Sequence, residues 1–119
     1  MLQPINYHIW FKVCKSIKHK YNLSTNCLLV LNGVYLYSEV FNMSFTRFAL
    51  LKFVTYYDNV RLGKYLSVLI GLKFIIESGL YKGHQLYCIS PDGLQVIKEL
   101  NDSYIIELNK FIDKYHVIL

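Results

Sequence analysis

Residues 61 to 68 carry the side chains best suited to molecular recognition. Four of them recur three or four residues apart, which places them on one face if the segment is helical. These four are Arg61, Lys64, Tyr65 and Val68. The opposite face carries three leucines, namely Leu62, Leu66 and Leu69. The segment therefore predicts a helix, from about residue 60 to 71, with a basic ridge outside and an apolar stripe inside.

The chemistry of this ridge is that of a surface that reads DNA. Guanidinium and ammonium groups pair with guanine edges or phosphates, hydroxyl groups donate to either, and valine suits a thymine methyl group. Three basic residues outside the helix, Lys73, Lys82 and His84, are better placed to contact phosphates beside the groove. Such contacts add affinity without sequence specificity. The candidate DNA-binding residues are Arg47, Asn59, Arg61, Lys64, Tyr65, Ser67, Val68, Lys73, Lys82 and His84.

A shorter helix and a tight turn are predicted before the ridge. Ser44 or Thr46 is able to cap this first helix. Its apolar stripe is predicted to consist of Phe48, Leu51 and Thr55. The segment Tyr56-Tyr57-Asp58-Asn59 then interrupts the apolar pattern with residues that favour turns and caps. Asn59 accordingly has an alternative role as the cap of the second helix.

A β-hairpin is predicted at about residues 73–89. Phe74-Ile75-Ile76 favours a strand, and residues 85–89 alternate polar with apolar side chains. Ser78-Gly79 and Lys82-Gly83 are both typical of turns. Ser90-Pro91 then supplies a capping hydroxyl and a proline suited to the first helical position, so a new helix follows. This order of elements suits a module that inserts one helix into a DNA groove.

The chain resembles the MarR-type winged-helix regulators loosely over residues 5–115. Leu23-Ser24, Cys27 and Val30-Leu31 resemble the opening helix pattern of that family, which has a Gln where this chain has Cys27. The resemblance implies a mainly α fold with a small β-hairpin. It also implies a winged helix-turn-helix module flanked by long N- and C-terminal dimerisation helices.

Further residues carry the same resemblance into the hairpin. Leu69, Phe74-Ile75 and residues 87–93 resemble the recognition-helix leucine, the first wing strand and the Thr-Pro-x-Gly-like helix start of the family. The family's wing usually has an Asp-x-Arg at its tip, whereas this tip offers only Lys82 and His84. This departure weighs against minor-groove reading by the wing. The resemblance also suggests a small aromatic effector between the module and the dimer helices.

Both ends of the chain are predicted to form amphipathic helices that serve association, at residues 5–20 and 91–115. Apolar residues recur every four positions in the first, and three or four apart in the second. Two such helices outside a small core favour a homodimer in which they interlock. The candidate dimerisation residues are Ile5, Ile9, Val13, Ile17, Tyr104, Leu108, Phe111, Ile112 and Tyr115. A monomer that folds both helices onto its own module is the alternative.

Length and charge fit one domain that binds a polyanion. The 119 residues suffice for a single domain, with the winged helix-turn-helix module at residues 24–93. The net charge is +5, and residues 1–38 contain no acid. Residues 92–115 reverse this balance with five acids against three lysines, so the basic surface is expected away from the last helix. Lysines that merely keep an apolar chain soluble are the alternative explanation.

Several classes of protein are not favoured. The sequence has no glycine-rich phosphate loop, no His-Glu-x-x-His and no nucleophile-elbow motif, so we expect no enzyme. Three cysteines without a Cys-x-x-Cys pair favour neither a disulfide framework nor a metal site, and no cofactor is expected. Apolar runs are too short for a membrane span and no secretion signal is visible, which favours the cytoplasm.

Two functional hypotheses follow. The first is a sequence-specific, homodimeric transcriptional regulator of double-stranded DNA, whose two recognition helices would meet major grooves about 34 Å apart on an inverted repeat. The second is a winged helix used as a protein-interaction or assembly module without DNA binding. Three features favour the second hypothesis: the ridge has few charges, namely Arg61 and Lys64, the wing is short, and the apolar content is high at 54%.

Overall fold

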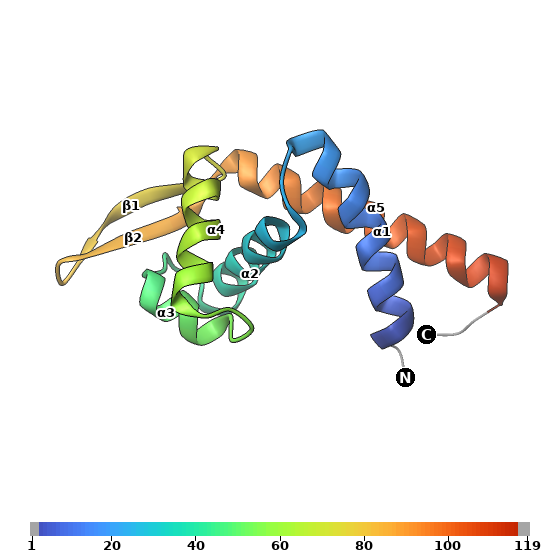
Figure 1. Cartoon of the computed structure of the whole chain (residues 1–119), viewed down its shortest axis with the longest axis horizontal. Helices are drawn as coiled ribbons and strands as arrows, with labels where there is room; N and C mark the ends of the chain where they lie inside the picture. The colour runs from blue at the N-terminus through green and yellow to red at the C-terminus, as the bar shows by residue number, and fades with distance from the viewer. Residues whose placement is uncertain (1–2, 117–119) are drawn as a thin grey trace.

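The computed structural model describes residues 3–116, with side chains from His8 onward. Seven elements follow one another: α1 (Gln3–Tyr21), α2 (Thr25–Phe41), α3 (Arg47–Phe53), α4 (Asn59–Gly71), β1 (Ile75–Tyr81), β2 (His84–Ile89) and α5 (Pro91–Tyr115). The molecule is elongated, 54 × 28 × 25 Å. The β-hairpin projects at one end, and α1 with the second half of α5 forms the other (Figure 1). The fold is therefore the expected winged helix-turn-helix with long terminal helices.

Polar side chains cap four of the five helices. Ser24, Thr46 and Ser90 accept hydrogen bonds from backbone amides of their first helical turns at 3.0–3.1 Å. Asp58 does the same for α4, with its Oδ1 accepting from the Arg61 amide at 2.8 Å. Thr46, one of the two predicted candidates, is thus the N-cap of α3. The N-cap of α4 is Asp58 and not Asn59, which had been considered for that role. Asp58, one position before Asn59, has the extended backbone conformation that an N-cap residue needs.

The hairpin differs from the prediction in where it turns. β1 and β2 pair in antiparallel register from Ile75 opposite Ile89 to Tyr81 opposite His84. Only Lys82-Gly83 forms the turn, and both residues have positive φ, as a tight two-residue hairpin requires. Ser78-Gly79, predicted as turn material, lies inside β1 at a shift in register. It is a β-bulge, which leaves one residue unpaired and twists the strand.

One continuous core joins the module to the terminal helices. It contains the predicted leucines of α4, together with buried side chains of α1, α2 and α5. In α3, however, the fully buried residue is Leu50, whereas Phe48 is 66% exposed and Leu51 is only partly buried. Thr55 lies beyond the helix and is exposed. The predicted stripe was wrong because α3 ends at Phe53 and is too short to repeat it.

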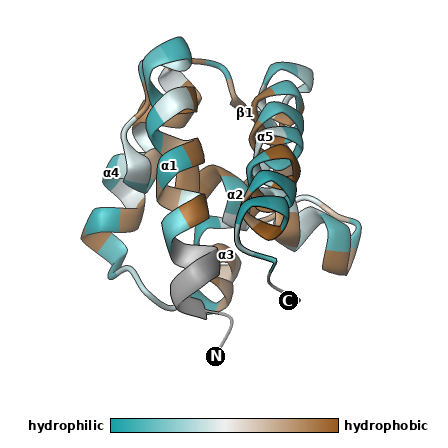
Figure 2. Cartoon of the chain, turned by 90° about the vertical axis from the view of Figure 1, so that its right-hand side faces the viewer, coloured by the Kyte–Doolittle hydropathy of each residue, from teal (hydrophilic) through white to brown (hydrophobic). Residues whose placement is uncertain are grey.

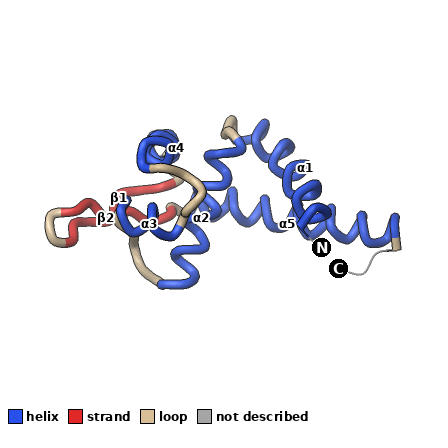
Figure 3. The backbone as a smooth tube through the Cα atoms, turned by 60° about the horizontal axis from the view of Figure 1, so that its bottom comes forward, coloured by secondary structure: helices blue, strands red, loops and turns tan. Residues whose placement is uncertain are grey.

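Helix α1 packs against the middle and second half of α5. Figure 2 shows α1 and α5 as neighbours, and the tube in Figure 3 shows the hairpin at the opposite end of the molecule from both termini. Two ion pairs link the helices, Lys12 with Glu107 at 2.9 Å and Lys20 with Glu99 at 2.8 Å. Trp10 of α1 also meets Tyr104 of α5 edge to face. These contacts tie the beginning of the chain to its end.

Candidate nucleic-acid interface

Helix α4 is held in place by one apolar face. Leu62 and Leu69 are completely buried, and Leu66 nearly so. They pack in the core beneath α2 and the start of β1. Each fully buried leucine contributes about 1.5–3 kcal/mol through the hydrophobic effect. The helix is therefore anchored firmly enough to present its other face in a fixed orientation.

The other face of α4 is open and mostly polar. Arg61, Lys64 and Ser67 are exposed, and Val68 is 42% exposed. Ser67 Oγ donates to the Gly63 carbonyl at 2.9 Å within the helix. Tyr65 differs from the rest of the predicted ridge because it is only partly exposed and packs against the core. Of the six predicted DNA-binding residues in α4, four thus lie on one accessible face, namely Arg61, Lys64, Ser67 and Val68.

An aromatic cluster supports the start of α4. The Tyr57 ring lies 4.9 Å from that of Tyr56 and 5.2 Å from that of Tyr65. The Tyr57 hydroxyl donates to Asn26 Oδ1 at 2.6 Å, which connects the turn to α2. Burial is the main reason why the pKa of Tyr57 rises to about 12. This tyrosine is a neutral, structural hydrogen-bond donor at physiological pH.

Arg61 has an acidic neighbour. Its Nε lies 3.9 Å from Asp58 Oδ2, in a pair whose side chains are 69% and 65% exposed. Pairs as exposed as this one contribute little to stability and exchange readily with other partners. The guanidinium of Arg61 is therefore available to an incoming phosphate or base.

Arg47 occupies a position that sequence reasoning did not foresee. Its Nη2 donates to the Asn59 carbonyl at 2.7 Å, and the guanidinium lies where a side chain on Gly63 would otherwise stand. Arg47 thus joins the start of α3 to the first turns of α4. Gly63 was the only sequence signal for this contact, since a glycine inside a helix often marks the close approach of another group.

The other predicted phosphate contacts come from the hairpin region. Lys73 adopts positive φ just before β1, and its carbonyl accepts from Ser90 Oγ at 2.6 Å. Lys82 stands in the hairpin turn with its Nζ 5.3 Å from the Tyr81 ring centre. His84 opens β2 and is exposed. These three basic residues are separated from Arg61 and Lys64 of α4, so the predicted cations come from several elements rather than from one cluster.

A hollow of about 350 Å³ lies between the starts of α3 and α4 and strand β2. Its lining residues come from all three elements: Thr46, Arg47, Phe48, Asn59, His84, Gln85 and Tyr87. None of them is acidic. The hollow brings together three of the predicted DNA-binding residues, Arg47, Asn59 and His84, which are far apart in sequence.

The residues predicted for dimerisation are divided between the core and the surface. Ile9, Val13 and Ile17 are buried within the single chain, and the side chain of Ile5 lies outside the described residues. Three residues of α5 are partly buried against the core, namely Tyr104, Leu108 and Phe111. Ile112 is half-buried, whereas Tyr115 is 55% exposed. The α1 stripe therefore serves the chain's own α5.

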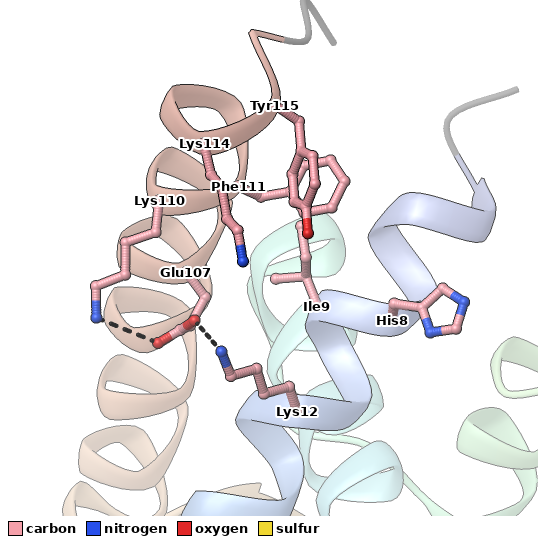
Figure 4. Close-up of a pocket in the computed structure, with 8 residues that line it drawn as sticks. All are labelled: His8, Ile9, Lys12, Glu107, Lys110, Phe111, Lys114 and Tyr115. Carbon is pink, nitrogen blue, oxygen red and sulfur yellow. Dashed lines mark ion pairs between the residues drawn. The ribbon is translucent and has the colours of Figure 1, made fainter.

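Figure 4 shows how α1 and α5 meet near the termini. Lys12 and Lys110 both approach the Glu107 carboxylate, at 2.9 and 3.5 Å. The ring centres of Phe111 and Tyr115 lie 4.7 Å apart, with the two rings tilted by 43°. The hydrogen bond from Lys12 is the largest of the effects that lower the pKa of Glu107. Just beyond, Ile105 and Ile106 of α5 are each 54% exposed. This end of α5 thus combines satisfied charges with uncovered apolar side chains.

Metal sites, membrane-spanning helices and reactive cysteines are the remaining features of interest. Among residues 3–116, no three or more His, Cys, Asp or Glu side chains gather where they would hold a metal ion. Within the same residues, no helix is long and apolar enough to span a membrane. Cys14 is completely buried, which raises the pKa of its thiol to about 11. A thiol in this state is a poor nucleophile.

Comparison with known proteins gives similarity in structure alone. No protein-family model and no curated protein matches the sequence. MepR of Staphylococcus aureus, a transcription regulator of the multidrug efflux pump MepA, superimposes with a TM-score of 0.76 at 12% identity, over 94% of this chain and 79% of MepR. MepR in complex with DNA gives 0.73 at 10% identity, over 97% and 83%.

Two further structures belong to MarR proteins. Wild-type MarR of Escherichia coli matches with a TM-score of 0.69 at 13% identity, over 95% of this chain and 81% of MarR. Staphylococcus aureus MarR in complex with salicylate and kanamycin matches with 0.72 at 15% identity, over 94% and 72%. The order of elements and these superpositions together establish that this chain has the MarR-type winged-helix fold.

Proposed function

We propose that the protein is a sequence-specific DNA-binding transcriptional regulator that acts as a homodimer, with α4 in the major groove and the β1–β2 hairpin as wing. One observation carries the proposal: α4 buries three leucines and leaves Arg61 and Lys64 exposed on the opposite side. Cationic side chains on a firmly anchored helix are what groove recognition needs. The presence of DNA in the complex of the similar MepR supports this reading.

The homodimer is proposed to form through α5. Ile105 and Ile106, on its second half, are each 54% exposed. Exposed isoleucines on one long helix favour burial against a second copy. Two α4 helices related by a two-fold axis would then contact half-sites about 34 Å apart.

Titration of a fluorescently labelled duplex of mixed sequence tests the proposal. Binding should weaken by orders of magnitude as salt rises from low to moderate concentration, because each neutralised phosphate releases counterions. Arg61→Ala should weaken binding roughly tenfold, whereas Lys15→Ala, on the exposed face of α1, should leave it unchanged. Binding that is absent, or indifferent to salt and to Arg61→Ala, would rule out the DNA-binding role.

An effector site is a finer part of the proposal. A hollow of about 360 Å³ lies between α2 of the module and α5, bordered by Tyr35, Leu94 and Lys98. Tyr35 offers an aromatic wall and Lys98 a cation for a small aromatic anion, whereas Asp102 is the one acid among the lining residues. The structure of Staphylococcus aureus MarR contains salicylate. Addition of salicylate should release DNA from the wild type, and Lys98→Ala should reduce this release.

A protein-interaction module is the second candidate function. It is favoured by apolar side chains exposed around the same surface, with Val60 at 79%, Leu80 at 71% and Phe48 at 66%. Leu80 stands near the wing tip, where a DNA-binding wing would carry polar or basic residues. If the duplex titration fails, these three side chains define the surface on which a protein partner would be sought.

A further inference from the structure

A third hollow lies between the end of α2, the segment that enters α3, and the hairpin. Its volume is about 540 Å³, within the range of about 300–1,000 Å³ that is typical of small-molecule sites. The hairpin leaves the module beside these helices (Figure 1), and β2 contacts both α2 and α3. The lining residues are Tyr37, Met43, Ser44, Thr46, Ala49, Tyr81 and Leu86. None of them borders the effector hollow proposed between α2 and α5.

The lining of this hollow is uncharged. It contains no Asp, Glu, Lys, Arg or His side chain, and most of it is apolar or aromatic. Moving an ion out of water costs far more than moving a neutral group, unless an opposite charge meets the ion. The hollow therefore favours a neutral occupant over an anion or a cation.

Tyr37 forms a fixed aromatic wall of the hollow. It is only 8% exposed, and its ring is held by those of Phe41, Phe45 and Phe53, at centre distances of 4.6, 6.0 and 5.5 Å. Tyr81 and Met43 line the same hollow but are 58% and 60% exposed, so both are free to close on an occupant. Aromatic rings pair favourably with other rings and with thioether sulfur. The three side chains together suit an aromatic ring.

Two contacts tie the hairpin to the segment before α3. Phe45 and Tyr87 exchange backbone hydrogen bonds of 2.8 and 2.9 Å. Ser78, in the β-bulge, donates from its Oγ to Ser44 Oγ at 2.9 Å, which leaves the Ser44 hydroxyl able to donate to an occupant. Residues 79–86 form the outer half of the hairpin, beyond both contacts. Tyr81 in this outer half faces the module across the hollow.

We propose that this hollow binds a neutral aromatic molecule that carries a hydrogen-bond acceptor, and that the bound ring fastens the outer half of the hairpin to the end of α2. The ring contacts Tyr37 and Tyr81, and its polar atom accepts from Ser44. The site differs from the effector hollow proposed above both in place and in the charge of its ligand. Through the hairpin, an occupant controls the proposed wing, and this last consequence rests on the proposed function.

Titration with 2-naphthol tests the site directly. Met43 is one of two methionines in the chain, so methyl labelling of methionine with ¹³C gives a signal inside the hollow, which Met43→Leu identifies. 2-Naphthol is a neutral phenol at about pH 7, whereas 2-naphthoate is an anion of similar size. The Met43 signal should shift saturably with 2-naphthol and require at least roughly tenfold more 2-naphthoate. No shift, or an equal response to both compounds, would overturn the site.

Two variants of the lining test the assignment of this shift. Tyr81→Ala removes an exposed ring and should raise the half-saturating concentration of 2-naphthol roughly tenfold. Ala49→Leu fills part of the hollow and should also weaken binding by at least roughly that factor. Tyr115→Ala, at the end of α5 and 55% exposed, is the matched control and should respond as the wild type. Binding by either lining variant as strong as that of the wild type would overturn the assignment.

Amide hydrogen exchange tests the link to the hairpin. Saturating 2-naphthol should slow the exchange of residues 79–86 several-fold in the wild type, because an occupied hollow restrains the outer half of the hairpin. The same concentration should leave Tyr81→Ala nearly unchanged. Exchange that is not slowed, although the Met43 signal shifts, would overturn the link to the hairpin and retain the site. None of these measurements contains DNA, so their failure is distinguishable from failure of the proposed DNA binding.

Discussion

Helices α4 and α5 bury similar faces but leave opposite kinds of surface exposed. In α4, the exposed side carries Arg61 and Lys64. In the second half of α5, it carries Ile105 and Ile106 beside charged residues such as Lys110. A polar exposed face is stable in water and ready for a charged partner, whereas exposed isoleucines are stabilised by an apolar one. The contrast supports the two proposals that α4 contacts DNA and that α5 contacts a second copy of the chain.

The largest expected effect comes from the buried side of α4. Leu69→Ala removes a fully buried side chain and should lower the free energy of unfolding by about 2–5 kcal/mol. Val68→Ala, one residue earlier on the exposed side, should cost much less. Urea unfolding of both variants measures the difference. Equal losses would show that the two faces of α4 are not distinguished as described.

The exposed side of α5 is tested by charge. Ile105→Lys should dissociate the dimer, since a lysine in an apolar interface loses its hydration without gaining a partner. Val40→Lys, at a position on α2 that is 64% exposed, serves as the control. Analytical ultracentrifugation should find the control dimeric and Ile105→Lys monomeric and folded. A dimer that tolerates Ile105→Lys would move the interface to another surface.

Asp58 allows the charge of the α4 surface to be changed without losing the cap. Asn caps helices about as well as Asp, so Asp58→Asn should alter the free energy of unfolding by only a few tenths of a kcal/mol. The variant removes the acidic neighbour of Arg61 and should bind duplex more tightly, by several-fold at low salt. Asp92→Asn, at the start of α5, serves as the control, because it removes one negative charge away from Arg61. Weaker binding by Asp58→Asn would mean that the carboxylate orients Arg61 for recognition.

The smallest expected effect concerns the ion pairs between α1 and α5. A hydrogen bond from Lys20 is the main cause of the lowered pKa of Glu99. A carboxylate whose pKa is lowered by folding stabilises the protein at neutral pH, and this contribution is lost as pH falls below about 4.3. Glu99→Gln should slightly lower the melting temperature at neutral pH and leave it unchanged near pH 3. The effect is small because the Lys20 side chain is 60% exposed, so that solvent screens the pair.

Much of the fold was predictable because local signals agreed with one another. The leucine spacing of α4, the hydroxyl of Ser90 before a proline and the amphipathic α5 all led to elements that the structure contains. Phe48 was misplaced because a two-turn helix is too short for its periodicity to be informative. The bulge at Ser78-Gly79 was missed because the same residues favour turns and bulges alike.

The candidate site was only partly predictable for a different reason. The ridge residues share one helix, so their spacing alone groups them. The hollow joins Arg47, Asn59 and His84 through packing between elements, which no spacing reveals. Val96 of α5 is likewise buried although it was not among the predicted dimerisation residues, because α5 also packs against α2. Long-range packing, rather than local propensity, decided each of these cases.

The salt dependence of duplex binding by a variant that combines Arg61→Ala with Lys64→Ala tests the central claim most directly. If both side chains neutralise phosphates or meet base edges, the slope of log affinity against log salt should fall by up to about two, and affinity should drop strongly at every salt concentration. A matched variant, Lys15→Ala with Lys18→Ala on the exposed side of α1, should retain the wild-type slope. Identical curves for the two variants would contradict the assignment of DNA to α4.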